Sequence, residues 1–178
     1  MSNKDKKGID AIFSIFFYRE VYMNWNDVYQ ENIKLDKLFY DNPSIDIINK
    51  NKLELLVEFS EFANETKCFK YWSSKTPNKD MMLEELADCF IMTLSFFNYL
   101  KLDLNINKFE LDKDNINLFF KLYKLGVSFI DKESDIIIKD IFNILLNIGY
   151  NLGLTDNDMI TSCINKINKN KLRIKDGY

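Results

Sequence analysis

The sequence predicts an all-α fold, a bundle of several helices, and three observations lead to this. The chain has 178 residues, of which 47% are hydrophobic, enough for one domain with a sizeable core. Only 5 glycines and 2 prolines occur, whereas all-β folds need many turn residues. Apolar residues recur at helical spacing over long segments that few breaks interrupt. We therefore expect long helices joined by few turns.

Six helical segments are expected in this bundle. Their apolar spacing places them at 25–40, 45–69, 79–99, 115–130, 134–152 and 155–172. Ser44 and Thr155 are typical N-cap residues, and Gly153 is typical of the position that ends a helix. The expected breaks are 41–44, a loop at 73–78 that contains Pro77, an irregular stretch at 100–111, and 131–133.

The two ends of the chain differ from this bundle. Residues 1–23 are expected to form an N-terminal extension, in which 9–23 are apolar enough for a helix although their pattern is ambiguous. Residues 24–178 are expected to form a single all-α domain without internal repeats. Its last residues, 173–178, are expected to form a short tail that stays mobile until something binds it.

Composition and charge exclude several classes of function. A formal net charge of −3 gives no basic surface for duplex nucleic acid, and no apolar run approaches the length of a membrane span. The three cysteines form neither a metal-binding motif nor a disulfide framework, which indicates a cytoplasmic protein. The chain contains no histidine, so Ser-His-Asp catalysis and histidine-ligated zinc are excluded.

Four glutamates form a stripe on the predicted helix 45–69. Glu54, Glu58, Glu61 and Glu65 lie at positions i, i+4, i+7 and i+11, within an arc of about 60° on a helix. Like charges stacked in this way repel each other. Because apolar residues surround the stripe in sequence, the helix is expected to be largely buried and its carboxylates to need a counter-charge.

A second acidic cluster, formed by Glu84, Glu85 and Asp88, lies on the predicted helix 79–99. No lysine or arginine occurs between 81 and 100 to pair with it. Clustered carboxylate oxygens suit Mg²⁺ or Mn²⁺. We expect the two clusters to face each other on antiparallel helices and to hold divalent metal for hydrolysis of a nucleoside triphosphate. The alternative is a solvated acidic face.

Several short motifs occur in a fixed order along the chain. They are Asn32-x-x-Leu35-Asp36, Glu58-Phe-Ser-Glu61, Asn64-Glu65-Thr66, Phe69-Lys70-Tyr71-Trp72, Glu84-Glu85-Leu-Ala-Asp88 and Lys166-x-x-x-Asn170-x-x-Arg173 followed by Gly177-Tyr178. With this order and spacing the chain resembles the dimeric all-α dUTPases. These belong to a wider group of all-α NTP pyrophosphatases that includes the MazG-like enzymes. The resemblance covers about residues 25–178.

The resemblance implies a bundle of the all-α NTP pyrophosphatase type, a homodimer, and cleavage of dUTP to dUMP and pyrophosphate with Mg²⁺, or with Mn²⁺. It implies that Glu58, Glu61, Glu85 and Asp88 are the catalytic metal ligands. We expect Glu58 also to orient or deprotonate the attacking water. Metal ions neutralise phosphate charge and lower the pKa of water, so no covalent intermediate is needed.

The same resemblance assigns the residues that bind substrate. Lys70 and Arg173 are expected to bind phosphate oxygens, with Lys166 as a further candidate. Trp72 is expected to stack on the nucleoside or form a wall beside it, and its alternative role is core packing.

Two asparagines and the C-terminal residue complete this set. Asn32 and Asn170 carry both a donor and an acceptor, as recognition of a uracil edge or a sugar hydroxyl requires. Tyr178 is expected to pack over the site when the tail closes.

The sequence departs from the family at Ile91 and Met92, where the family usually has His and Phe beside the deoxyribose. This departure motivates one other hypothesis, a related pyrophosphatase that acts on dCTP or another non-standard nucleotide. Two more hypotheses are open independently of it. A second is a non-catalytic homologue that binds a nucleotide or a partner, and a third is a purely structural bundle.

Overall fold

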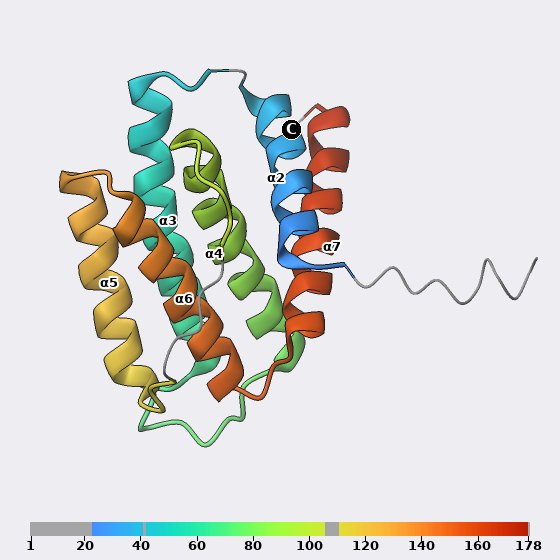
Figure 1. Cartoon of the computed structure of the whole chain (residues 1–178). Helices are drawn as coiled ribbons and strands as arrows, with labels where there is room; N and C mark the ends of the chain where they lie inside the picture. Colours follow the sequence, from blue (N-terminus) through green and yellow to red (C-terminus); the bar gives the residue numbers. More distant parts are fainter. Residues whose placement is uncertain (1–22, 41, 106–110, 178) are drawn as a thin grey trace, which may run out of the picture.

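The computed structural model describes residues 23–40, 42–105 and 111–177 and confirms the all-α fold (Figure 1). Within these residues there are six helices and no strand. The helices are α2 (Trp25–Phe39), α3 (Ile45–Thr66), α4 (Lys79–Tyr99), α5 (Asn115–Asp131), α6 (Asp135–Asn151) and α7 (Asp156–Lys175). Apart from Met23, the predicted segment 9–23 lies outside the described residues, as does Tyr178.

The predicted helix ends are confirmed at three places. The Ser44 hydroxyl accepts a hydrogen bond from the Ile47 backbone N–H and so caps α3. Thr155 and Asp158 form a capping box at the start of α7, in which each side chain accepts from the other's backbone N–H. Gly153 follows α6 with a φ of 78°, a left-handed conformation that a glycine adopts without steric cost.

Two helix ends differ from the prediction by three residues. Helix α3 ends at Thr66 rather than at 69, because Lys67 takes a left-handed conformation and the Thr66 hydroxyl accepts from the Cys68 backbone N–H. Residues 67–78 therefore form the connection to α4. Helix α7 continues to Lys175, where cationic side chains in the last turn complement the negative end of the helix dipole. Arg173 is thus helical, although we expected it in a tail.

Helix α4 lies at the centre of the bundle and packs against α2, α3, α6 and α7 (Figure 1). Its second half is almost completely buried. The centroid of the Trp25 ring in α2 lies 4.6 Å from the ring centroid of Phe90 and 5.2 Å from that of Phe142 on α6. Burying each such large apolar side chain contributes about 1.5–3 kcal/mol. The acidic residues of α4 are thus carried by the most firmly packed helix.

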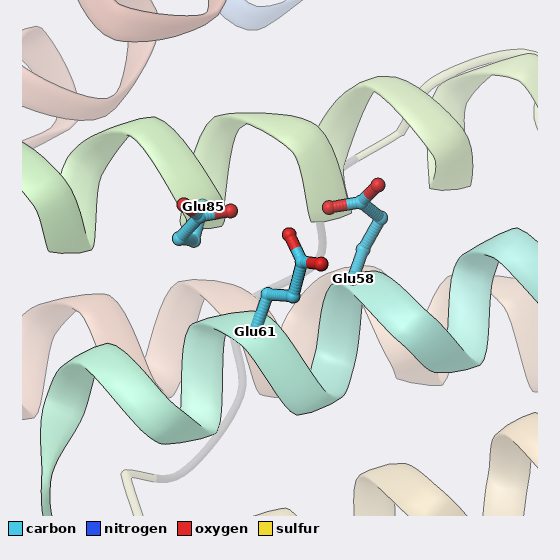
Figure 2. Close-up of side chains that lie close together, drawn as sticks. All are labelled: Glu58, Glu61 and Glu85. Carbon is cyan, nitrogen blue, oxygen red and sulfur yellow. The ribbon is translucent and has the colours of Figure 1, made fainter.

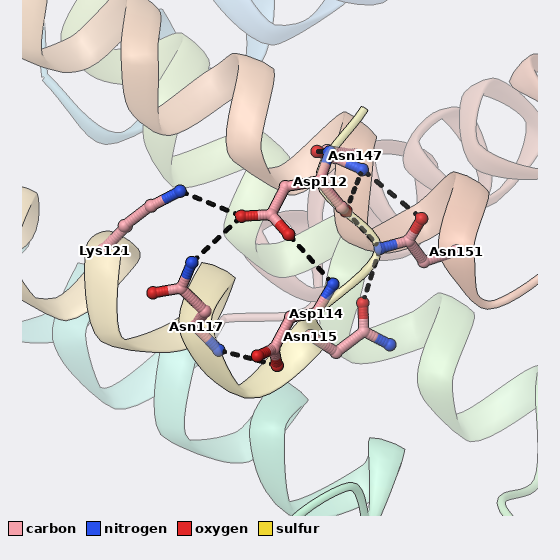
Figure 3. Close-up of polar contacts among 7 residues, drawn as sticks. All are labelled: Asp112, Asp114, Asn115, Asn117, Lys121, Asn147 and Asn151. Carbon is pink, nitrogen blue, oxygen red and sulfur yellow. Dashed lines mark hydrogen bonds and ion pairs between the residues drawn. The ribbon is translucent and has the colours of Figure 1, made fainter. Parts of the chain in front are cut away.

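Asparagine side chains of α6 form hydrogen bonds with the segment before α5 (Figure 3). Asn147 accepts from the Asp112 backbone N–H at 2.9 Å and donates to the Asp112 carbonyl at 3.0 Å. Asn151 donates to the same carbonyl at 2.7 Å and also to Asn115. Lys121 forms an ion pair with the Asp112 carboxylate. These bonds fix where α5 begins relative to α6.

The three cysteines are free, in agreement with the expected lack of a disulfide framework. Of the helices in the described ranges, none has the length and apolar character to cross a membrane.

Candidate metal and active site

The two acidic clusters face each other across neighbouring helices. Helices α3 and α4 run antiparallel and are joined by residues 67–78 (Figure 1). Glu58 and Glu61 of α3 extend toward α4, and Glu85 of α4 lies opposite them (Figure 2). One carboxylate oxygen from each of the three lies within 4.8 Å of the others. The structure therefore brings together three of the four residues expected to be metal ligands.

These carboxylates lie in a cavity of about 380 Å³ that is bounded by four helices. Its walls come from α2, α3, α4 and α7. The residues that line it are Phe39, Glu54, Glu58, Glu61, Glu85, Asp88, Lys166, Asn170, Arg173 and Ile174. Acidic groups from α3 and α4 thus face basic and amide groups from α7.

Glu58 is the most perturbed carboxyl group of the cavity. Burial raises its pKa to about 8, and the nearby charges of Asp88, Glu61, Glu54 and Glu85 add to this rise. Its Oε2 atom is buried and has no hydrogen-bond partner. Burial also raises the pKa of Glu85 to about 6, with Asp88 and Glu61 as further causes. Ionising this cluster is therefore costly without a cation.

A divalent cation fits the three converging glutamates. In the described part of the chain none of them forms an ion pair with a lysine. Mg²⁺ and Mn²⁺ prefer clustered carboxylate oxygens as ligands. A buried carboxylate oxygen without a hydrogen-bond partner would be satisfied by binding such a cation. The donor set, the unpartnered Glu58 Oε2 atom and the raised pKa values all favour a cation here.

Asp88 lies about one helical turn beyond Glu85, but within the residues that the structure describes it forms an ion pair with a lysine, unlike the three converging glutamates. Lys166 of α7 donates to its Oδ2 atom at 2.5 Å and also contacts Glu84 at 3.3 Å. Lys169 approaches Glu84 at 2.7 Å. Burial raises the pKa of Asp88 despite Lys166, whereas the bonds from Lys169 and Lys166 lower the pKa of Glu84. The sequence offered no lysine or arginine on α4 itself to pair with Glu84 and Asp88. In the structure their basic partners, Lys166 and Lys169, come from α7.

Three of the predicted substrate-binding residues lie on α7 at the cavity. They are Lys166, Asn170 and Arg173, spaced so that one face of the helix presents them. Arg173 donates to the Asn170 side-chain oxygen at 3.4 Å. The structure thus gathers these residues opposite the acidic cluster.

Asn32 is fully buried in α2 and does not line this cavity. Its side-chain amide donates to the Ile91 carbonyl at 3.3 Å and to the Ser95 hydroxyl at 3.0 Å, while its Oδ1 atom has no partner. Ser95 in turn donates to Asp36 at 2.7 Å, and Asn98 donates to the other Asp36 oxygen. Asn32 thus belongs to a polar network between α2 and α4.

Ser95 and Asn98, two members of that network, were missed by sequence reasoning. Their spacing of three residues on a helix places them on one face, and this pattern could have indicated them. Ile91, which stands where the family has His, is only 6% exposed and packs in the core. Met92 is partly buried against the same core.

Lys70 and Trp72 lie in the connection between α3 and α4 and do not line the cavity. Trp72 is 65% exposed, so the alternative role of core packing is wrong. Its ring meets those of Phe69 and Tyr71 at centroid distances of 6.1 and 5.0 Å. The Lys70 ammonium lies 5.7 Å from the Phe69 ring centroid. Together these residues form an exposed aromatic and basic surface.

The chain was compared with models of known protein families. The family model for dUTPases matches residues 12–178 of this chain. The match includes residues 12–23, so the similarity begins nearer the N-terminus than the motifs indicated. A search of curated proteins found none that matches the chain.

Proposed function

Since this chain belongs to the dUTPase family, we propose that it hydrolyses dUTP with a divalent cation held by Glu58, Glu61, Glu85 and Asp88. The family assignment itself makes the protein an enzyme, a dUTP diphosphatase. The choice of Mg²⁺, with Mn²⁺ as a substitute, is our proposal. The observation that carries it is the convergence of three carboxylates, and a buried Glu58 oxygen without a hydrogen-bond partner supports it.

Glu58 is the residue that we propose to act on the attacking water. Burial raises the pKa of Glu58 to about 8 and that of Glu85 to about 6, so of these two carboxylates Glu58 binds a proton more strongly. When bound, the cation supplies charge neutralisation for the triphosphate and acidifies a nearby water.

The α7 residues Lys166, Asn170 and Arg173 are proposed to bind the phosphate chain. They line the wall opposite the carboxylates, so a triphosphate between them would meet positive charge on one side and the cation on the other. For Lys70 and Trp72 we propose contacts from outside the cavity, since both lie on the exposed connection. Asn32 would influence substrate binding indirectly, through its hydrogen bonds to the Ile91 carbonyl and the Ser95 hydroxyl.

We also propose that the protein forms a homodimer. The family resemblance implies it, and exposed apolar side chains on the neighbouring helices α3 and α5 offer a surface for it. These side chains are Leu53, Val57, Phe120 and Val127. Sedimentation equilibrium should give twice the mass of the 21.2 kDa chain, and a monomeric mass at micromolar concentration would contradict the proposal.

Two substitutions test the proposed site. Glu58→Gln and Asp88→Asn remove a charge with little change of shape, and each should abolish the release of pyrophosphate from dUTP while circular dichroism shows unchanged helicity. Asp46→Asn is the matched control, because it removes an exposed carboxylate at the far end of the same helix as Glu58. It should retain full turnover. Normal turnover in both site variants would refute the assignment.

A related substrate is the second candidate, because Ile91 and Met92 replace the usual His and Phe. Both side chains pack into or against the core rather than lining the cavity. The test is a panel of dUTP, dCTP, dTTP and UTP at equal concentration, with pyrophosphate release as readout. The assignment requires a clear preference for dUTP, and a preference for dCTP would support the alternative.

A further inference from the structure

The four carboxylates proposed as metal ligands are not equivalent in the structure. Glu58, Glu61 and Glu85 converge on each other. Asp88, in contrast, is bonded by the Lys166 ammonium at 2.5 Å. A protein cation is therefore already bonded to one oxygen of Asp88, a carboxylate that a divalent cation is proposed to share.

The pair between Lys166 and Asp88 differs from an ordinary surface ion pair. The two side chains are only 13% and 15% exposed, whereas the neighbouring Lys169 is 48% exposed. Little water screens the pair, so its electrostatic interaction is stronger than that of a solvent-exposed pair. Removing one member of such a pair leaves the other charge uncompensated.

A substrate phosphate bound in the same cavity would give Lys166 an alternative partner. Its side chain lines the cavity together with the three converging glutamates. A lysine has a flexible four-carbon stem and a compact charge, so its ammonium can move between acceptors without a helix shift. A phosphate group placed between the carboxylates and α7 would offer such an acceptor.

We propose that Lys166 is an internal counter-ion that competes with the divalent cation for Asp88. In the metal-free enzyme its ammonium neutralises Asp88. With a cation bound, Asp88 would become a ligand as well, and the Lys166 ammonium released from it would bind a phosphate oxygen of the substrate. Lys166 thereby links occupancy of the metal site to phosphate binding. This inference rests on the proposed function, and it gives Lys166 a second role beside its proposed binding of phosphate.

The test is the affinity for Mn²⁺ in the absence of nucleotide, measured from the paramagnetic resonance signal of the free ion. Lys166→Met keeps the length of the side chain and removes its charge, and we expect it to bind Mn²⁺ about tenfold more tightly than the wild type. Lys169→Met is the matched control, since it removes the same charge from α7, and among the described residues the Lys169 ammonium forms its ion pair with Glu84 and not with Asp88. It should leave the affinity within about twofold of the wild type.

Two further variants separate the possible outcomes. Lys166→Gln should also bind Mn²⁺ more tightly, and it replaces Lys166→Met if that variant lacks the helical signal of the wild type. Glu58→Gln should abolish binding, which identifies the site being measured. If the wild type binds but Lys166→Met and Lys169→Met change the affinity equally, the competition is absent and only this inference fails. If the wild type binds no Mn²⁺, the proposed metal site fails with it.

Discussion

The unusual pKa of Glu58 predicts that the metal-free enzyme becomes less stable as pH rises. In the unfolded chain Glu58 loses its proton near its usual pKa of 4.5, whereas in the folded chain it keeps the proton to about 8. Between these values unfolding releases a proton, so each rise in pH favours the unfolded state. Below pH 4.5 both states are protonated and Glu58 has no effect, and above about 8 its full cost is present.

The size of this effect follows from the pKa. A rise from 4.5 to about 8 corresponds to about 5 kcal/mol at 1.36 kcal/mol per pH unit. The ionised cluster can relax and attract counter-ions, so we expect about 2–4 kcal/mol in practice. Glu58→Gln removes the charge, and its amide can donate to neighbouring carboxylates such as Glu61. In EDTA at pH 8.5 this variant should therefore be more stable than the wild type by that amount.

Urea unfolding at pH 5, 7 and 8.5, followed by circular dichroism, measures the free energy of unfolding at each pH. The difference between Glu58→Gln and the wild type should be at most about 1 kcal/mol at pH 5 and grow toward pH 8.5. With saturating Mg²⁺ the order should reverse, because only the wild type gains stability from binding. A constant difference across this pH range in EDTA would refute the reasoning, since it would show that Glu58 ionises normally in the fold.

Two further predictions concern the packing around the site. Gly126→Ala should lower the free energy of unfolding by about 1–2 kcal/mol, because the added Cβ would lie 2.6 Å from the Cδ2 atom of Leu56 and 3.1 Å from the Phe59 ring. Chemical denaturation measures this free energy. An unchanged or raised value would show that α5 does not press against α3. Asp36→Asn should cost about 1–3 kcal/mol, because the new amide donor would face the Ser95 or Asn98 donor that the carboxylate now accepts. Thermal unfolding compared with the exposed variant Asp46→Asn tests it, and equal melting temperatures would contradict it.

The convergence of Glu58, Glu61 and Glu85 was predictable from the sequence because each position follows from helical spacing. Residues three apart share a helix face, and a connection of about a dozen residues brings the two faces together in an antiparallel pair. The same reasoning predicted the caps of Ser44 and Thr155, which depend on local chain geometry alone. These features need no knowledge of how distant parts of the chain pack.

The features that were not predictable depend on such packing. The partner of Asp88 is 78 residues away, and only the placement of α7 beside α4 brings Lys166 to it. The burial of Asn32 likewise depends on Ser95 in a different helix. Trp72 lies outside any helix, so no periodicity indicated which way its ring would face. The end of α3 has no glycine, and Lys67 adopts the left-handed conformation instead.

The sequence neighbours of the four carboxylates explain how the fold holds like charges together. Each of them is followed directly by a residue that is at most 1% exposed, namely Phe59, Phe62, Leu86 and Cys89. On a helix the next residue lies about 100° further round, so burying these four positions turns the carboxylates toward the facing helix. Neither helix can rotate to relieve the repulsion without exposing this apolar surface, at about 1.5–3 kcal/mol for each large side chain. The core therefore keeps the charges close until a cation binds, and the strain that lowers metal-free stability is the same feature that makes the site selective for a cation.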